Sequence, residues 1–152
     1  MGFGKIFCIL GGLITIVATY VLAFYAFPPA YGWGIGAWMF VPAIFSSGEI
    51  MIILIEILVI LFLLAGVFQL IGAKSRVLGI IGSLLALAGF IYFMLIEFSL
   101  ISSTAIYALL FVGDALGPLP FHISVGTFAS LGAYVLAGGA VLGLIGSFAG
   151  RD

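Results

Sequence analysis

The sequence predicts an all-α integral membrane protein, a bundle of four transmembrane helices with the N and C termini cytoplasmic. Four apolar stretches of about 20 residues are each long enough to cross a hydrocarbon layer about 30 Å thick. Charged residues make up 6% of the chain, against about 25% in soluble domains. The four basic residues Lys5, Lys74, Arg76 and Arg151 all fall on one side of this arrangement. Lys and Arg favour the cytoplasmic side of short loops, so that side is expected to be the inside.

The boundaries of the spans follow from where the apolar runs stop. A Pro pair at residues 28–29 should end the first run, because Pro lacks a backbone N–H and cannot continue a helix. Lys74 and Arg76 flank a short inner turn, which makes the second and third spans antiparallel neighbours. The 152 residues suit one domain. The expected spans are 6–27, 50–73, 77–97 and 125–148, joined by outer loops 28–49 and 98–124.

The two halves of the chain resemble each other. Residues 5–13 align with residues 76–84, and residues 67–73 align with residues 141–147. Such a pattern is typical of two tandem helical hairpins related by an axis along the membrane normal. The alternative is chance agreement between helices rich in Gly, Leu and Ile, and the sequence leaves both open.

Small residues indicate which spans pack together. Lipid tails are as apolar as Leu, so helices pair in a bilayer where small residues allow close approach. Spans one, three and four carry such residues, whereas span two is bulky almost all round and is expected to face lipid or an apolar partner. Gln69 is expected to hydrogen-bond between helices. The helix-packing candidates are Gly11, Gly79, Gly82, Gly139 and Gly143.

Both outer loops are unusually apolar. The first contains Trp33, Trp38 and Phe40, and the second contains Phe111. Aromatic side chains favour the headgroup level of a bilayer, which is one explanation. A large apolar patch that docks a partner subunit is the other, and the two are compatible. These four residues are therefore partner-docking candidates.

Glu56 is the candidate for an ion pathway. It follows Ile50 by six residues and so lies about 9 Å along a helix from the outer end of span two. An ionisable group at that depth is costly and suggests function. Glu49 lies on the same helix face nearer the water, so the pair could admit protons or cations. The alternative is a structural, hydrogen-bonded carboxyl that meets Thr15, Thr19, Tyr20 or a neighbouring chain.

Other chemistry has weaker support in the sequence. His122 is the single histidine and could bind a cofactor, but no second ligand accompanies it at a recognisable spacing. One cysteine, Cys8, excludes an intrachain disulfide. No cofactor, metal or catalytic residue is expected. A net charge of −1 without a basic stripe argues against nucleic acid.

The leading functional hypothesis is a non-catalytic integral membrane subunit. It would pack against a larger membrane protein complex, of respiratory or transport type, and stabilise or assemble it. A proton or cation pathway or small transporter using Glu56, and a cofactor-carrying protein using His122, are the alternatives. The expected partners are the lipid bilayer and other integral membrane subunits or a second copy. The expected location is the prokaryotic cell membrane.

Overall fold

The structure is a computed structural model that describes residues 2–27, 30–98, 100, 111–114, 123 and 129–149. Within these residues the chain is mostly helical, with three short strands. The strands are β1 (Tyr25–Phe27), β2 (Ala30–Gly32) and β3 (Val112–Asp114). The helices are α1 (Phe3–Tyr20), α2 (Gly34–Ser47), α3 (Ile50–Leu63), α4 (Ala65–Ile71), α5 (Arg76–Glu97) and α7 (Leu131–Phe148).

The expectation of membrane-spanning helices is confirmed. Among the described residues, α1, α5 and α7 are each long and apolar enough to cross a membrane. Helices α3 and α4 make a fourth candidate when they are counted as one span, although they are bent by 47° relative to each other. The protein therefore has three to four apolar helices suited to a lipid bilayer.

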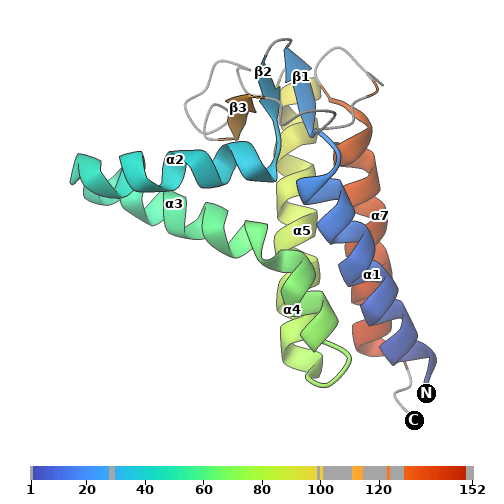
Figure 1. The fold of residues 1–152 in the computed structure, drawn as a ribbon. Coiled ribbons are helices and arrows are strands. Elements are labelled where there is room, and N and C mark those ends of the chain that lie inside the picture. The colour runs from blue at the N-terminus through green and yellow to red at the C-terminus, as the bar shows by residue number, and fades with distance from the viewer. Residues whose placement is uncertain are drawn as a thin grey trace.

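Four helices pack side by side to form what we call the stem. Helix α1 contacts α7 and α4, and α5 contacts the same two helices (Figure 1). The first residues of α1 and α5 and the last residues of α4 and α7 lie at one end. The basic residues Lys5, Lys74 and Arg76 thus gather there, and we call this the basic end. Arg151 lies outside the described residues.

Glycine lets the stem helices approach closely. A Cβ built on Gly11 would lie 2.5 Å from the Gly143 nitrogen, so α1 and α7 touch through backbone. A Cβ on Gly82 would lie 2.6 Å from the Ala65 carbonyl oxygen, where α5 meets α4. Gly79 and Gly139 also lie against atoms of neighbouring helices. All five glycines singled out in the sequence thus lie at helix contacts.

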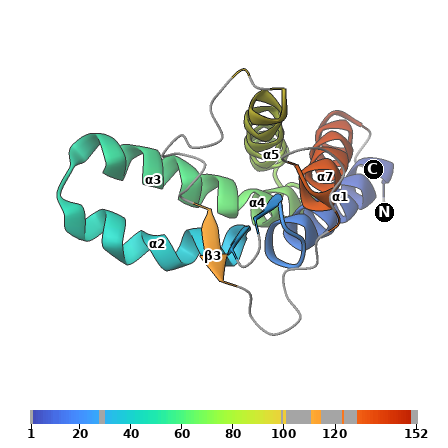
Figure 2. The same cartoon turned by 90° about the horizontal axis from the view of Figure 1, so that it is seen from above.

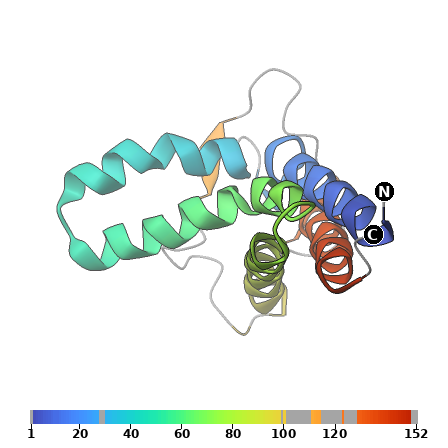
Figure 3. The ribbon, with the colours of Figure 1, turned by 90° about the horizontal axis from the view of Figure 1, so that it is seen from below.

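The segment expected as the first outer loop contains helix α2. Helices α2 and α3 form an antiparallel hairpin, called the arm, that projects sideways from the stem (Figures 1, 2 and 3). Gly48 reverses the chain at its tip with a φ of 73°, a left-handed conformation that favours glycine. The 14 residues of α2 span only about 21 Å, too short to cross a bilayer upright.

A small antiparallel sheet, ordered β1-β2-β3, covers the end of the stem opposite the basic end (Figure 1). The prediction of an all-α fold did not include it. It pairs Tyr25 with Gly32 and Tyr31 with Gly113. Because the chain turns into this sheet, α1 ends at Tyr20 and not near residue 27. The Gly132 N–H donates to the Ala23 carbonyl at 3.0 Å, which fixes the start of α7 beside the end of α1.

Adjacent glycines in α7 test this packing. A Cβ on Gly139 would lie 2.5 Å from Thr15 Oγ1, whereas a Cβ on Gly138 would have nothing within 4 Å. We expect Gly139→Ala to lower the free energy of unfolding by about 1–3 kcal/mol through overpacking. Gly138→Ala should change it by less than about 0.5 kcal/mol. Thermal unfolding in detergent measures both, and equal effects would contradict the packing described.

Candidate functional site

The break between α3 and α4 sets the direction of the arm. At the break, the Leu64 N–H donates to the carbonyls of Ile60 and Leu61 at 3.1 and 3.2 Å. Two residues later, a Cβ on Gly66 would lie 2.6 Å from Ile16 Cγ1 on α1. Glycine at this position therefore lets α4 stay against the stem while α3 turns away from it.

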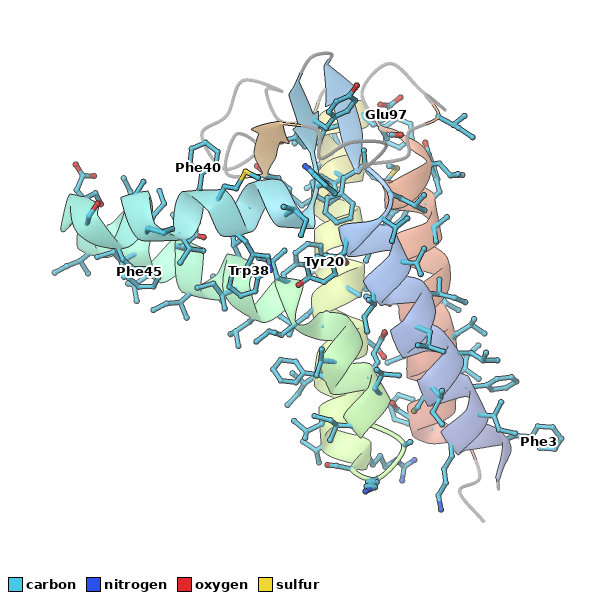
Figure 4. The ribbon with its side chains drawn as sticks, in the orientation of Figure 1. Phe3, Tyr20, Trp38, Phe40, Phe45 and Glu97 are labelled. Carbon is cyan, nitrogen blue, oxygen red and sulfur yellow. The ribbon has the colours of Figure 1, made fainter. Side chains whose placement is uncertain are left out.

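A short hydrogen-bond relay holds the base of the arm. The Tyr20 hydroxyl donates to the Leu63 carbonyl at 2.8 Å and lies 3.1 Å from Trp38 Nε1, which donates to it (Figure 4). Tyr20 belongs to α1, Trp38 to α2, and Leu63 is the last residue of α3. The relay thus links the stem to both helices of the arm, and it satisfies a carbonyl at the break.

Four phenylalanines fill the corner where arm, stem and sheet meet. The rings of Phe24 and Phe93 stack at 4.7 Å, and Phe62 lies edge-on to Phe111 at 5.7 Å. All four side chains are buried. Each such aromatic pair contributes about 0.5–1.5 kcal/mol beyond the burial of its area. We call this cluster the aromatic corner.

An apolar groove of about 380 Å³ lies between α3 and α5. On each helix its lining residues have the spacing i, i+3, i+4, i+7, so each set forms one continuous stripe. Phe62 of α3 packs against Gly89 of α5, and both residues line the groove. We call this the arm groove. It is lined by Ile55, Leu58, Val59 and Phe62 of α3, by Leu85, Ala88, Gly89 and Tyr92 of α5, and by Phe111.

The four docking candidates differ in exposure. Trp33 is fully buried and its backbone N–H donates to the Phe111 carbonyl at 3.0 Å, while the Phe111 side chain belongs to the aromatic corner. Trp38 is half-buried in the relay. Phe40 is half-buried and projects from α2 on the opposite side to the exposed Phe45 (Figure 4). The expectation of an outer loop at residues 28–49 did not place these side chains on the faces of a helix.

The two glutamates proposed as an ion pathway lie in different environments. The Glu56 side chain is 0% exposed, and neither of its oxygens has a hydrogen-bond partner among the described residues. Glu49 is exposed at the tip of the arm. The Thr19 hydroxyl donates to the Thr15 carbonyl at 2.7 Å instead of to Glu56. Among the described residues, the structure therefore shows no hydrogen-bonded path between the two carboxyl groups.

Gln69 links three helices of the stem. Its Nε2 atom donates to Ser83 Oγ and to the Gly139 carbonyl, each at 3.2 Å. Ser83 Oγ in turn donates to the Gly79 carbonyl at 2.7 Å. Gln69 is fully buried, and these bonds satisfy its amide nitrogen, while its Oε1 has no partner among the described residues. The expected interhelical role of Gln69 is thus seen between α4, α5 and α7.

The remaining candidates offer little chemistry in the described part of the chain. Burial, with a smaller contribution from nearby Tyr92, raises the pKa of the Tyr25 phenol well above its usual 10.0. Tyr25 is therefore a neutral group at physiological pH. No group of three or more metal-ligating His, Cys, Asp or Glu side chains occurs among the described residues. His122 lies outside them.

Comparison with protein-family models, curated proteins and solved structures found no match to this chain. The arm, the arm groove and the stem are thus the features from which a function can be inferred. These features provide apolar surfaces and an uneven distribution of charge, but few reactive groups among the described residues.

Removing one hydroxyl tests the relay at the base of the arm. Tyr20→Phe leaves the Leu63 carbonyl and Trp38 Nε1 without this partner, and an unsatisfied buried group costs about 1–3 kcal/mol. We expect faster hydrogen–deuterium exchange in α2 and α3 and little change in α7. Tyr134→Phe is the matched control, since it keeps the ring that contacts Phe90. Unchanged exchange in the arm of Tyr20→Phe would contradict this role.

Proposed function

We propose that the protein is a non-catalytic integral membrane subunit that stabilises or assembles a larger membrane protein complex of respiratory or transport type. In this proposal the arm groove receives an apolar transmembrane helix of the partner. The observation that carries the proposal is the groove itself, in which α3 and α5 each present one continuous apolar stripe. An apolar helix laid between two such stripes is a recurring mode of recognition.

The length and the lining of the groove suit a helix. Each stripe covers seven residue steps, from 55 to 62 and from 85 to 92, or about 10 Å of helix. A partner helix would therefore be held along roughly two turns. Ala88 is exposed on the α5 side, and a small side chain there permits close approach of another helix within a bilayer.

The outer face of the arm would extend the contact. Its apolar side chains Phe45, Met51, Leu54 and Leu58 are exposed, and Leu58 also lines the groove. A hairpin that projects from the stem presents these side chains at a distance from the protein's own core. A partner helix in the groove would touch the arm and α5 together, which supports a role in holding two helices at a fixed spacing.

The proposed orientation places the stem as a four-helix anchor with both termini in the cytoplasm of a prokaryotic cell. Support comes from the basic end, where Lys5, Lys74 and Arg76 lie together. Basic residues in short connections favour the cytoplasmic side. The sheet and the connection to α2 would then lie toward the outside. The bent pair α3 and α4 would form the second of the four membrane-crossing segments.

A proton or cation pathway is the second candidate, because Glu56 is fully buried without a hydrogen-bond partner among the described residues. A buried carboxyl in an apolar helix is a group that a moving ion could use. If it does, Glu56→Gln should abolish proton or cation flux into proteoliposomes that contain the purified protein. The midpoint of thermal unfolding should stay unchanged. Equal flux in the wild type and Glu56→Gln would exclude this pathway.

Filling the arm groove tests the leading proposal. Ala88→Trp places a bulky ring on the α5 side of the groove and should displace the partner helix. Leu84→Trp is the control, because Leu84 is exposed on α5 outside the groove. After extraction from native membranes in a mild detergent, native mass spectrometry should find the wild type and Leu84→Trp in one defined complex. The fraction of Ala88→Trp found outside that complex should be at least tenfold larger than the same fraction of the wild type.

Two outcomes would contradict the proposal. One is a wild-type particle with the mass of a single chain, 15.9 kDa, plus lipid and detergent. The other is a complex that Ala88→Trp leaves intact. A complex whose mass is a multiple of the single chain would identify the partner as a second copy.

A further inference from the structure

We propose that the basic end of the stem holds an anionic phospholipid in a groove between α1 and α4. This groove has a volume of about 510 Å³. Four of its lining residues are apolar, namely Ile9 of α1, Leu70 and Ile71 of α4, and Ala73 just beyond α4. The fifth is Lys74, which lies in the turn between α4 and α5. We call it the lipid groove, and it shares no lining residue with the arm groove.

The lipid groove lies beside a close contact between α1 and α4 that is made by a pair of glycines. A Cβ on Gly12 would lie 2.8 Å from the Gly66 carbonyl oxygen, and a Cβ on Gly66 would lie 2.9 Å from that of Gly12. Ile9 precedes Gly12 on α1, and the other lining residues follow Gly66. The groove therefore lies on the basic-end side of this contact.

Charge at the mouth of the lipid groove complements a phosphate. Lys74 lies in its lining, and Lys5 precedes Ile9 by four residues, which places it on the same face of α1 one turn nearer the end. The acidic residues among the described part of the chain are Glu49, Glu56, Glu97 and Asp114. They lie in the arm or toward the sheet. The mouth is thus positive with no described acidic residue at this end.

The third cation at this end is already engaged elsewhere. Arg76 Nε donates to the Ser147 carbonyl at 2.8 Å, and its guanidinium carbon lies 5.5 Å from the centre of the Phe148 ring. Both contacts belong to α7. Arg76 therefore carries the same charge at the same end of the stem but does not line the lipid groove, which makes it a matched control for Lys74.

The shape of the site favours a lipid over a free anion. Apolar walls extend from the cation toward the middle of the stem, where an acyl chain would displace other hydrocarbon. A lysine at such a boundary keeps its methylene groups on apolar surface and its ammonium at the headgroup level. Basic pockets between transmembrane helices bind anionic headgroups in this way. The site thus takes the phosphate at Lys74 and Lys5 and one acyl chain along Ile9 and Ile71.

The test uses the full chain in nanodiscs of phosphatidylcholine with a small fraction of phosphatidylglycerol, followed by native mass spectrometry. The wild type should retain phosphatidylglycerol over phosphatidylcholine. Lys74→Gln should weaken this retention about fivefold, the effect of about one surface cation. Lys74→Arg should preserve it, and Arg76→Gln should leave it within about twofold of the wild type.

A second variant tests the apolar part of the site. Ile9→Trp fills the lipid groove without changing the charge, so it should also lower the retention of phosphatidylglycerol. Thermal unfolding of each variant in phosphatidylcholine alone shows that it folds. Equal losses for Lys74→Gln and Arg76→Gln would overturn the proposal in favour of diffuse attraction. Full retention by Ile9→Trp, or competition by millimolar inorganic phosphate, would overturn it as well.

Discussion

The break at Leu64 is the constraint on which the rest of this structure depends. A straight helix from residue 50 to residue 71 would lie along α5 and cover the stripe from Leu85 to Tyr92. With a bend of 47°, α4 stays in the stem and α3 leaves with α2 as the arm. The arm groove is therefore a direct consequence of the break.

The break is stable because groups on both sides of it find partners. Tyr20 supplies a hydroxyl to the Leu63 carbonyl, and the aromatic corner fills the space above it with Phe24, Phe62 and Phe93. Backbone groups exposed to hydrocarbon are costly, so a bend in an apolar helix needs such a partner. The stem holds Tyr20 in place through the close contacts of α1 with α7 and α4.

Sequence patterns predicted the apolar, membrane-suited helices because such patterns report on one helix at a time. The apolar spans, the common end of Lys5, Lys74 and Arg76, and the glycines at helix contacts all follow from composition and period. The duplication of residues 5–13 in 76–84 stays a prediction, although α1 and α5 run in the same direction along the stem (Figure 1).

The features that the sequence did not reveal depend on tertiary contacts. Leu64 lies in a continuous apolar run without Pro, and Gly66 alone does not locate a break there. Helix α2 lies in the segment that was expected as an outer loop after the Pro pair, where the Trp and Phe residues fit either a headgroup layer or a docking patch. Strands of three residues are too short to show an alternating pattern. The position of Glu56 in an arm helix could not be predicted either, since the hairpin of α2 and α3 was not expected.

The most direct test of this account is the distance between the arm tip and the outer end of α5 in a bilayer. The distance between spin labels at Met51→Cys and Phe98→Cys can be measured by pulsed electron paramagnetic resonance, in a protein with Cys8 replaced by Ser. Both native side chains are 71% exposed. An arm of α3's length should hold the labels more than about 20 Å apart. A straight second span packed on α5 would bring them to about 10 Å, and that result would contradict the account.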